Sequence, residues 1–334
     1  MPSLLPSTAS GLFCEPGGFY VDPWAPAEVA VITHVHGDHL HPGSGRYVCA
    51  AASAPFLRKR MGPEVPVTAV PYGEQVTLGH TAVSFHPAGH VLGSAQVRIE
   101  AGGEVWVVSG DYKRAPDPTC APFEVVPCDV FVTEATFGLP IYRWDEPGQV
   151  VAEIFEWWEA NRKAGEASLL FCYAMGKAQR ILAELARLTD RTVLVHGAVE
   201  SLAALYREAG VPMLPTLPVA EAPRRRSYAG ELILAPPSAG GTPWVRRFGA
   251  RETAFASGWM RVRGTRRRRG FDRGFALSDH ADWPALLRTI EETGARRVLV
   301  THGYSEELAR FLRERGLEAE AVATAFEGEA GAET

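Results

Sequence analysis

The sequence has few cysteines, no long apolar run and no excess of positive charge. Its five cysteines are scattered and form no CxxC pair, which fits reduced thiols better than a disulfide framework or a thiolate zinc site. No apolar run approaches the roughly 20 residues needed to cross a bilayer. The opening segment MPSLLPSTAS lacks the basic and apolar regions of a secretory signal. We therefore expect a soluble, cytoplasmic protein that does not engage a membrane.

Charge is distributed unevenly along the chain. The formal net charge of −5 argues, on its own, against a general nucleic-acid binder. Residues 261–273 nevertheless hold seven arginines and one acid, and residues 224–226 form a second arginine cluster. Arginines gathered in this way predict a positive face for an anionic partner, and the alternative is a solvated loop.

Short apolar runs recur, and several end near a side chain that can bind a metal or move a proton. Runs of this length, rich in β-branched residues and bounded by turn residues, predict buried strands. They are 19–21 before Asp22, 29–32 before His34, 106–108 before Asp111, 130–132 before Glu134, and 298–300 before His302. Amphipathic stretches at 149–161, 177–188 and 283–293 predict helices between them. Strands alternating with helices predict an α/β layered fold.

The segment THVHGDHLHPGS, residues 33–44, is rich in metal-binding side chains. On an extended segment His34 and His36 point to the same side, and Gly37 permits a turn that brings Asp38 and His39 alongside. These four side chains can serve two adjacent metals. A zinc ion takes about four donors, so more ligands are needed. The further candidates follow predicted strands or lie between glycines: His90, Asp111, whose two oxygens could bridge two ions, and His302.

The same motifs resemble those of the metallo-β-lactamase superfamily. HxHxDH with His90 and Asp111 carries that resemblance, while Glu134 in TEATFG, His280 in LSDHAD and His302 in VTHG resemble motifs of its β-CASP nuclease branch. That branch includes Artemis and the cleavage-and-polyadenylation endonuclease. FCYAMGKAQRIL resembles a helix of the branch's inserted domain. From FYVDPW to SDHADWP, and over roughly residues 10 to 327, the chain is similar to the bacterial ligase-associated DNA damage response exonucleases.

The resemblance implies a particular architecture. Residues 1–144 and 271–326 would form a four-layered αββα metallo-β-lactamase domain. A smaller α/β β-CASP cap would be inserted at 145–270, and residues 327–334 would form a flexible tail.

The resemblance also implies roles for individual residues. One metal would be held by His34, His36 and His90, a second by Asp38, His39 and His302, and Asp111 would bridge both. Asp22 would orient a ligand histidine, and Glu134 would hold and polarise His280, the expected general acid. The alternative for Asp22 and Glu134 is that they only cap loops. Histidine-rich ligation suits Zn²⁺, and mixed carboxylate and imidazole sites also accept Mn²⁺.

The expected function follows from such a centre. Two divalent ions about 3.5 to 4 Å apart lower the pKa of a shared water and clamp a phosphate, so a bridging hydroxide could attack phosphorus in line. We expect an enzyme, a two-metal phosphodiesterase of nucleic acid. Its expected role is that of a DNA-repair exonuclease acting at the 5′ end of single-stranded DNA. An ATP-dependent DNA ligase and a helicase are implied as partners by the resemblance alone.

Three other functions remain in competition. In the β-CASP branch the last motif tends to be histidine in RNA enzymes and valine in the eukaryotic DNA enzymes, so His302 favours an RNA-processing nuclease. A small-molecule metallo-hydrolase could use the same HxHxDH ligands, although the additional motifs and the arginine cluster oppose it. An inactive binding scaffold conflicts with the full set of ligands.

Several further residues are expected to contact nucleic acid. Guanidinium and ammonium groups can grip phosphates, and aromatic rings can stack on bases, with core packing as the alternative for each ring. The candidates are Lys177, Ser278, Arg266, Arg267, Arg268, Arg269, Tyr142 and Trp259, with Trp144 and Trp244 as further rings.

Overall fold

A computed structural model describes residues 3–223, 226–262 and 270–323 of the chain. The chain divides into two compact units. Of the described residues, those up to 143 and those from 280 to 323 form unit 1, and those between 144 and 279 form unit 2. Unit 1 therefore takes its residues from both ends of the chain.

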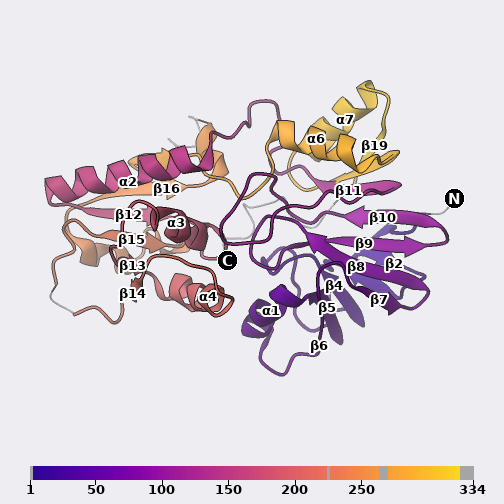
Figure 1. The fold of residues 1–334 in the computed structure, drawn as a ribbon, viewed down its shortest axis with the longest axis horizontal. Coiled ribbons are helices and arrows are strands. Elements are labelled where there is room, and N and C mark those ends of the chain that lie inside the picture. Colours follow the sequence, from indigo (N-terminus) through magenta and orange to yellow (C-terminus); the bar gives the residue numbers. More distant parts are fainter. Residues whose placement is uncertain (1–2, 224–225, 263–269, 324–334) are drawn as a thin grey trace. The chain divides into compact units, whose positions relative to one another are not determined.

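Unit 1 contains two β-sheets (Figure 1). The six-stranded sheet has the order β1-β2-β3-β4-β5-β6, antiparallel from β1 to β3 and parallel from β3 to β6. Its strands are β1 (Ser7–Thr8), β2 (Gly11–Cys14), β3 (Phe19–Val21), β4 (Val29–Ile32), β5 (Arg46–Ala50) and β6 (Val67–Val70).

The second sheet of unit 1 has seven strands in the order β19-β18-β11-β10-β9-β8-β7. The pairs β10–β11, β11–β18 and β18–β19 are parallel, and the others are antiparallel. Its strands are β7 (Gln75–Leu78), β8 (Thr81–Pro87), β9 (Ala95–Ala101), β10 (Glu104–Val108), β11 (Val130–Glu134), β18 (Arg297–Thr301) and β19 (Glu318–Ala321).

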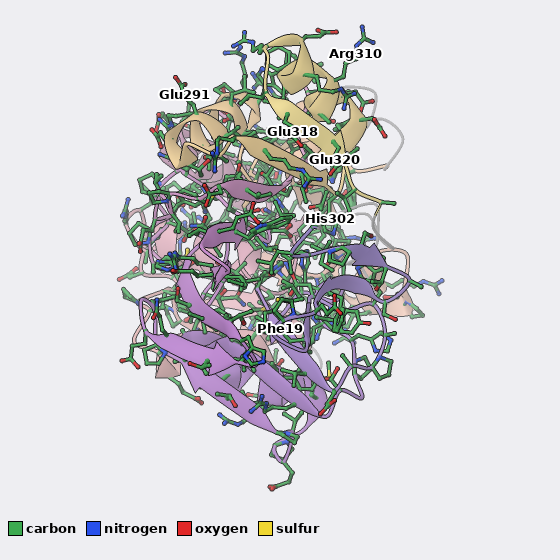
Figure 2. All side chains as sticks on the ribbon, turned by 90° about the vertical axis from the view of Figure 1, so that its right-hand side faces the viewer. Phe19, Glu291, His302, Arg310, Glu318 and Glu320 are labelled. Carbon is green, nitrogen blue, oxygen red and sulfur yellow. The ribbon has the colours of Figure 1, made fainter. Side chains whose placement is uncertain are left out.

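The two sheets share an apolar core. Phe19 and Val31 of the six-stranded sheet pack in one cluster with Val97, Trp106 and Val108 of the seven-stranded sheet. Phe19, labelled in Figure 2, lies on the opposite side of His302 from Glu318 and Glu320 of β19. Because side chains alternate along a strand, the residues that lie between these core residues point to the outer face of each sheet.

Two helices cover the outer face of the seven-stranded sheet. Val107 and Val298 of that face pack with Leu286 of α6 (Trp283–Thr293) and Leu308 of α7 (Ser305–Glu314). With both faces of the sheet buried, its strands become nearly continuous apolar runs, as the sequence has them. Helix α6 begins where the Asp282 carboxylate accepts from the Ala285 N–H at 3.0 Å. The other helices in the described residues of unit 1 are η1 (Ala51–Ser53) and α1 (Ala54–Met61).

Unit 2 is built on an all-parallel sheet of six strands, in the order β14-β13-β15-β12-β16-β17. Leu170 and Leu234 on one face pack with Ile154, Trp157 and Ile181 of the covering helices. The strands are β12 (Ala167–Phe171), β13 (Val193–Val195), β14 (Thr216–Pro218), β15 (Leu232–Ala235), β16 (Arg251–Ala256) and β17 (Arg273–Phe275). Where the structure describes this unit, its helices are α2 (Pro147–Ala164), α3 (Lys177–Leu185), α4 (Gly197–Glu208), η2 (Pro237–Ala239), η3 (Pro243–Phe248) and η4 (Gly258–Arg261).

The α/β class predicted from the sequence is confirmed, and each of the five predicted apolar runs lies within a strand. The helix predicted at 283–293 coincides with α6, and the one at 149–161 lies within the longer α2. The third prediction, 177–188, extends three residues beyond α3, because the chain continues past Leu185 in a turn. Within the described residues, none of the helices has the length and apolar character required to span a bilayer.

Candidate metal centre

The ligand-type side chains of unit 1 follow the carboxyl ends of strands. Asp22 follows β3, the segment with His34 follows β4, and Asp111 lies three residues beyond β10. Glu134 is the last residue of β11, and His302 directly follows β18. The pairs β3–β4, β10–β11 and β11–β18 are parallel, so within each sheet these ends meet at one edge.

The Asp111 carboxylate lies at the middle of the cluster. Its Oδ2 is 3.4 Å from His34 Nε2 and 3.8 Å from His90 Nε2. Its Oδ1 is 3.5 Å from His39 Nε2. The two oxygens of one carboxylate therefore face different imidazoles, which is the arrangement that a bridging ligand needs.

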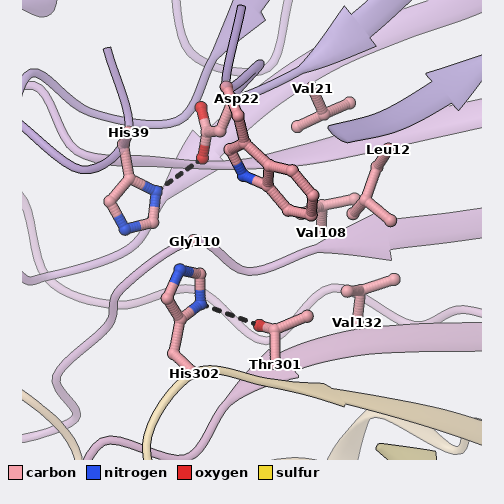
Figure 3. A pocket seen from close by; sticks show the side chains of 10 residues that line it. Leu12, Val21, Asp22, His39, Val108, Gly110, Val132, Thr301 and His302 are labelled. Carbon is pink, nitrogen blue, oxygen red and sulfur yellow. Dashed lines mark hydrogen bonds and ion pairs between the residues drawn. The ribbon is translucent and has the colours of Figure 1, made fainter. Parts of the chain in front are cut away.

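The other predicted ligands surround this carboxylate. His36 Nδ1 lies 3.1 Å from His90 Nε2, and Asp38 Oδ2 lies 4.0 Å from His39 Nε2. The His302 ring stacks on the His39 ring with centroids 5.1 Å apart (Figure 3). Ligand atoms of His34, His36, His90 and Asp111 all lie within 4.8 Å of one another. The structure thus brings all seven predicted ligands together.

The donor set fits divalent metal ions. In the described part of the chain, His34 Nε2, His39 Nε2 and Asp38 Oδ1 are buried atoms without a hydrogen-bond partner. Burying such atoms unpaired is costly unless something compensates. Imidazole nitrogens and carboxylate oxygens are the donors that Zn²⁺ and Mn²⁺ accept. Bound metal ions would compensate all three atoms.

Hydrogen bonds orient two of the imidazoles for this task. The Thr33 hydroxyl donates to Asp22 Oδ2 at 2.6 Å, so at 3.1 Å it can only accept from His34 Nδ1. The Thr301 hydroxyl donates to the Thr133 carbonyl at 3.2 Å and lies 3.1 Å from His302 Nδ1. In both histidines the proton is therefore on Nδ1 and the lone pair on Nε2.

Asp22 holds a third imidazole. Its carboxylate accepts from the Thr33 N–H at 2.8 Å and from His39 Nδ1 at 2.7 Å (Figure 3). His39 Nε2 is thereby turned toward Asp111, whose Oδ1 lies 3.5 Å away. Asp22 and His302 are the two non-glycine residues with positive φ in the described chain, at 43° and 55°. Backbone conformations of this kind cost energy and cluster at functional sites.

Burial and charge set the protonation states of the cluster. Burial, reinforced by His34, lowers the pKa of His36 to about 3. Burial, reinforced by His39, lowers the pKa of His302 to about 4, and burial also lowers the pKa of His90 well below its usual value. These imidazoles are neutral at pH 7, as metal ligands must be.

His39 and Asp111 differ from the other ligands. Burial alone would lower the pKa of His39, but the carboxylates of Asp111, Asp38 and Asp22 outweigh it and raise that pKa well above its usual value. Burial would raise the pKa of Asp111, but His39 and His280 hold it well below its usual value. His39 would have to lose a proton before it could act as a metal ligand.

A second pair of residues lies beside this cluster. Glu134 is buried, and its Oε2 and Oε1 lie 2.9 and 3.1 Å from His280 Nδ1. Glu134 Oε1 also accepts from the Tyr112 N–H at 2.8 Å. The His280 and His90 rings have centroids 4.7 Å apart. Because Glu134 engages Nδ1, any proton transfer by His280 would use Nε2.

Lys177, one of the predicted nucleic-acid contacts, lies in the interior of unit 2. Lys177 has no exposed surface, and its Nζ lies 2.6 Å from Asp279 Oδ2 in a buried ion pair. Arg180 binds the other oxygen of Asp279 at 3.0 Å and donates to the Ser278 carbonyl at 2.7 Å. The structure therefore assigns Lys177 to an internal ion pair rather than to a phosphate-binding surface.

The remaining predicted contacts divide into three groups. Ser278 and Tyr142 are buried, and Tyr142 packs on Phe137 with ring centroids 4.8 Å apart, which agrees with the core-packing alternative. Trp259 is half-buried in η4. Arg266, Arg267, Arg268 and Arg269 lie outside the described residues, as do Arg224, Arg225 and the acidic tail at 327–334.

Two residues near the centre carry no signal in the sequence. Thr33 joins Asp22 to His34, and Arg60 of α1 donates through Nη1 to the Val35 carbonyl at 2.7 Å. The predicted turn after His36 is present, with the His39 N–H donating to the His36 carbonyl at 3.2 Å. Gly37 is not among the glycines with positive φ. A Cβ there would instead lie 3.3 Å from Arg60 Nη2, so glycine at this position leaves room for the guanidinium.

The fold and site define an α/β protein with histidines and carboxylates clustered as in divalent-metal centres. No family model matches the chain. It is 32% identical over 315 residues to a probable DNA ligase of Opitutus terrae, which covers 93% of this chain and 30% of that protein. An endoribonuclease YSH1 of Gibberella zeae is 32% identical over 121 residues, 35% of this chain and 14% of that protein. An RNase J-like protein of Methanocaldococcus jannaschii is 27% identical over 147 residues, 40% of this chain and 34% of that protein.

The chain thus spans about a third or less of the length of these relatives. One of these relatives is named as a probable DNA ligase, one as an endoribonuclease and one as RNase J-like. Among solved structures, a protein of unknown function from Enterococcus faecalis V583 matches 89% of this chain and 79% of that chain. The TM-score of 0.59 at 11% identity indicates a shared fold and nothing more.

Proposed function

We propose that the chain is a metal-dependent phosphodiesterase that hydrolyses nucleic acid. Unit 1 would be its metallo-β-lactamase domain and unit 2 the inserted β-CASP domain. The observation that carries this proposal is the Asp111 carboxylate, whose two oxygens face separate imidazoles within 3.8 Å, with the Glu134–His280 pair beside them.

The ligands divide into two sets around Asp111. One ion would be held by His34, His36 and His90. The other ion would be held by Asp38, His39 and His302, and Asp111 would contact both ions. When bound, two divalent cations such as Zn²⁺ or Mn²⁺ supply an activated water and a clamp for the phosphate. Asp22, Thr33 and Thr301 serve this centre by directing Nε2 of the histidines they contact toward it.

The Glu134–His280 pair would supply the proton that the leaving oxygen needs. The Glu134 carboxylate accepts from Nδ1 and so stabilises His280 when the ring is protonated on both nitrogens. The proton on Nε2 can then pass to the leaving alkoxide, which is a poor leaving group without it. General acids of this kind typically contribute 10²- to 10⁴-fold to the rate.

We assign the activity to DNA repair, as an exonuclease at the 5′ end of single-stranded DNA. This assignment is supported by how much of the chain is similar to each relative. Similarity to the probable DNA ligase extends over 93% of this chain, whereas similarity to the YSH1 endoribonuclease extends over 35%. An ATP-dependent DNA ligase and a helicase are the proposed partners. The second candidate is RNA processing, which the ribonuclease names and the histidine at position 302 favour.

The test is a substrate panel. The protein, loaded with Zn²⁺ or Mn²⁺, is given 5′- or 3′-labelled single-stranded DNA, duplex DNA, RNA and a chromogenic lactam, with a chelator as control. We expect metal-dependent release of mononucleotides from the 5′ end of single-stranded DNA. Preferred cleavage of RNA would support the second candidate, and hydrolysis of the lactam alone would contradict both.

A further inference from the structure

The last turn of α1 carries three exposed cations, Arg58, Lys59 and Arg60. Within the described residues none of the three forms an ion pair. Cations at the carboxyl end of a helix are favoured by the helix dipole, which accounts for their presence. It does not account for the direction that Arg60 takes.

The Arg60 guanidinium lies against the segment that carries the metal ligands. Its Nη1 donates to the carbonyl of Val35, between His34 and His36, at 2.7 Å. Its Nη2 would lie 3.3 Å from a Cβ built on Gly37, between His36 and Asp38. A fixed positive charge is therefore held one residue away from candidate ligands of both metals.

This is also a side on which the centre meets solvent. His34, His39 and His90 are buried, whereas His36 is half-buried and Gly37 is exposed. A phosphate that reaches the metals past His36 would pass the guanidinium. The Arg60 guanidinium has five N–H donors. Within the described chain it makes one hydrogen bond, to the Val35 carbonyl.

We propose that Arg60 binds a non-bridging oxygen of a substrate phosphodiester beside the metal centre, with Arg58 and Lys59 near the next phosphate along the strand. This inference rests on the proposed nuclease function. A planar guanidinium suits the task because two of its N–H groups can contact one phosphate together, which a lysine ammonium cannot reproduce. The bond to Val35 holds the guanidinium in place beforehand.

The experiment compares Arg60→Gln and Arg60→Lys with the wild-type holoenzyme on labelled single-stranded DNA and RNA. KM and kcat are measured at a series of salt concentrations, together with bound metal by atomic emission and the melting temperature. For Arg60→Gln we expect KM to rise about tenfold and the negative slope of log(kcat/KM) against log salt to become shallower by about 0.7. Arg60→Lys should keep the salt slope and lose part of the affinity.

Arg310→Gln is the matched control, because Arg310 is an exposed arginine of the same unit on α7 that pairs with Glu314 at 2.9 Å. It should leave KM and the salt slope unchanged. A purely structural Arg60 would lower bound metal and the melting temperature in Arg60→Gln with an unchanged salt slope, and that result overturns the proposal. If the wild type cleaves nucleic acid and Arg60→Gln matches it, the Arg60 inference alone fails. If the wild type cleaves neither DNA nor RNA, the proposed function fails with it.

Discussion

At the scale of single residues, Asp111 and His280 both lie close to the metal centre but have different proposed roles, a bridging ligand and a general acid. Asp111 faces three imidazoles, so Asp111→Ala should remove bound metal and activity together. His280 is bonded to Glu134, so His280→Ala should keep the metal and lose about 10²- to 10⁴-fold in kcat. Metal content and turnover are measured on the same preparations. Loss of metal from His280→Ala would make His280 a ligand, and near-normal activity of Asp111→Ala would remove its bridging role.

Asp22 tests whether orientation of a ligand matters. Its carboxylate accepts from Thr33 N–H, the Thr33 hydroxyl and His39 Nδ1. In Asp22→Asn an amide NH₂ would face one of these donors, so His39 would lose its fixed direction. Outer hydrogen bonds of this kind are typically worth 10- to 100-fold in metal affinity, and we expect a loss in that range by competition with a chelator. Glu124→Gln, which changes the partner of the peripheral His86, is the control and should bind metal normally.

At the scale of elements, the close approach of two loops makes Gly110 a sensitive position. Gly110 lies between β10 and Asp111 with φ of 55°, and a Cβ there would lie 2.6 Å from Thr33 Cβ and Oγ1. Gly102 has φ of 60° and no neighbour within 4 Å. Gly102→Ala should cost about 1 kcal/mol of unfolding free energy, from backbone conformation alone. Gly110→Ala should cost about 1 to 3 kcal/mol more, from overpacking.

Urea denaturation of both variants measures the difference, and chelator competition shows whether metal binding is disturbed as well. Thr33 holds Asp22 and His34, so we expect weaker metal binding in Gly110→Ala and normal binding in Gly102→Ala. Equal stability of the two variants would mean that the loops separate without cost.

The elements themselves were predictable where the chemistry is local. The strand at 29–32 follows from an apolar run, and the helix at 283–293 follows from an amphipathic pattern. The histidine cluster at 34–39 was predictable for the same reason, because its spacing lies within one turn of chain. The role of Arg60 was not predictable, since a hydrogen bond over 25 residues to a backbone carbonyl leaves no mark in the sequence. The role of Thr33 was not predictable either, because it depends on a hydrogen bond to Asp22 across 11 residues. The ion pair of Lys177 with Asp279, 102 residues away, was not predictable from the sequence for the same reason.

At the scale of the whole molecule, the centre joins segments from both ends of the chain. His34 and Asp111 precede unit 2, whereas His280 and His302 follow it, and the Glu134–His280 bond spans 146 residues. Bound metals would therefore oppose separation of the first and last segments of unit 1. A ligand that binds only the folded state stabilises it by mass action. We expect saturating Zn²⁺ to raise the melting temperature of the wild type and to leave that of Asp111→Ala nearly unchanged.

The metal-free protein should lose stability in mild acid. The folded-state pKa values of His36, His90 and His302 are lowered, to about 3 for His36 and about 4 for His302, so between pH 6 and pH 4.5 the unfolded chain binds protons that the folded chain refuses. The free energy of unfolding therefore decreases as the pH is lowered, by at least about 1 kcal/mol per pH unit.

His39 acts in the opposite sense, because its pKa is raised. Its contribution is fully present below the unfolded value and is lost only as the pH rises through the folded value, so it stays constant in the acid window. The lowered pKa of Asp111 likewise contributes above the unfolded value of an aspartate and begins to be lost only near pH 4. The three neutral imidazoles therefore set the slope between pH 6 and pH 4.5 together with His196, whose pKa is also lowered by burial. Urea denaturation of chelator-treated protein across this range measures it, with His80→Gln, on an exposed histidine, as the control that should keep the wild-type slope. Stability that is flat or rises toward pH 4.5 would mean that the three imidazoles accept protons in the folded state, and they would then be poor ligands at neutral pH.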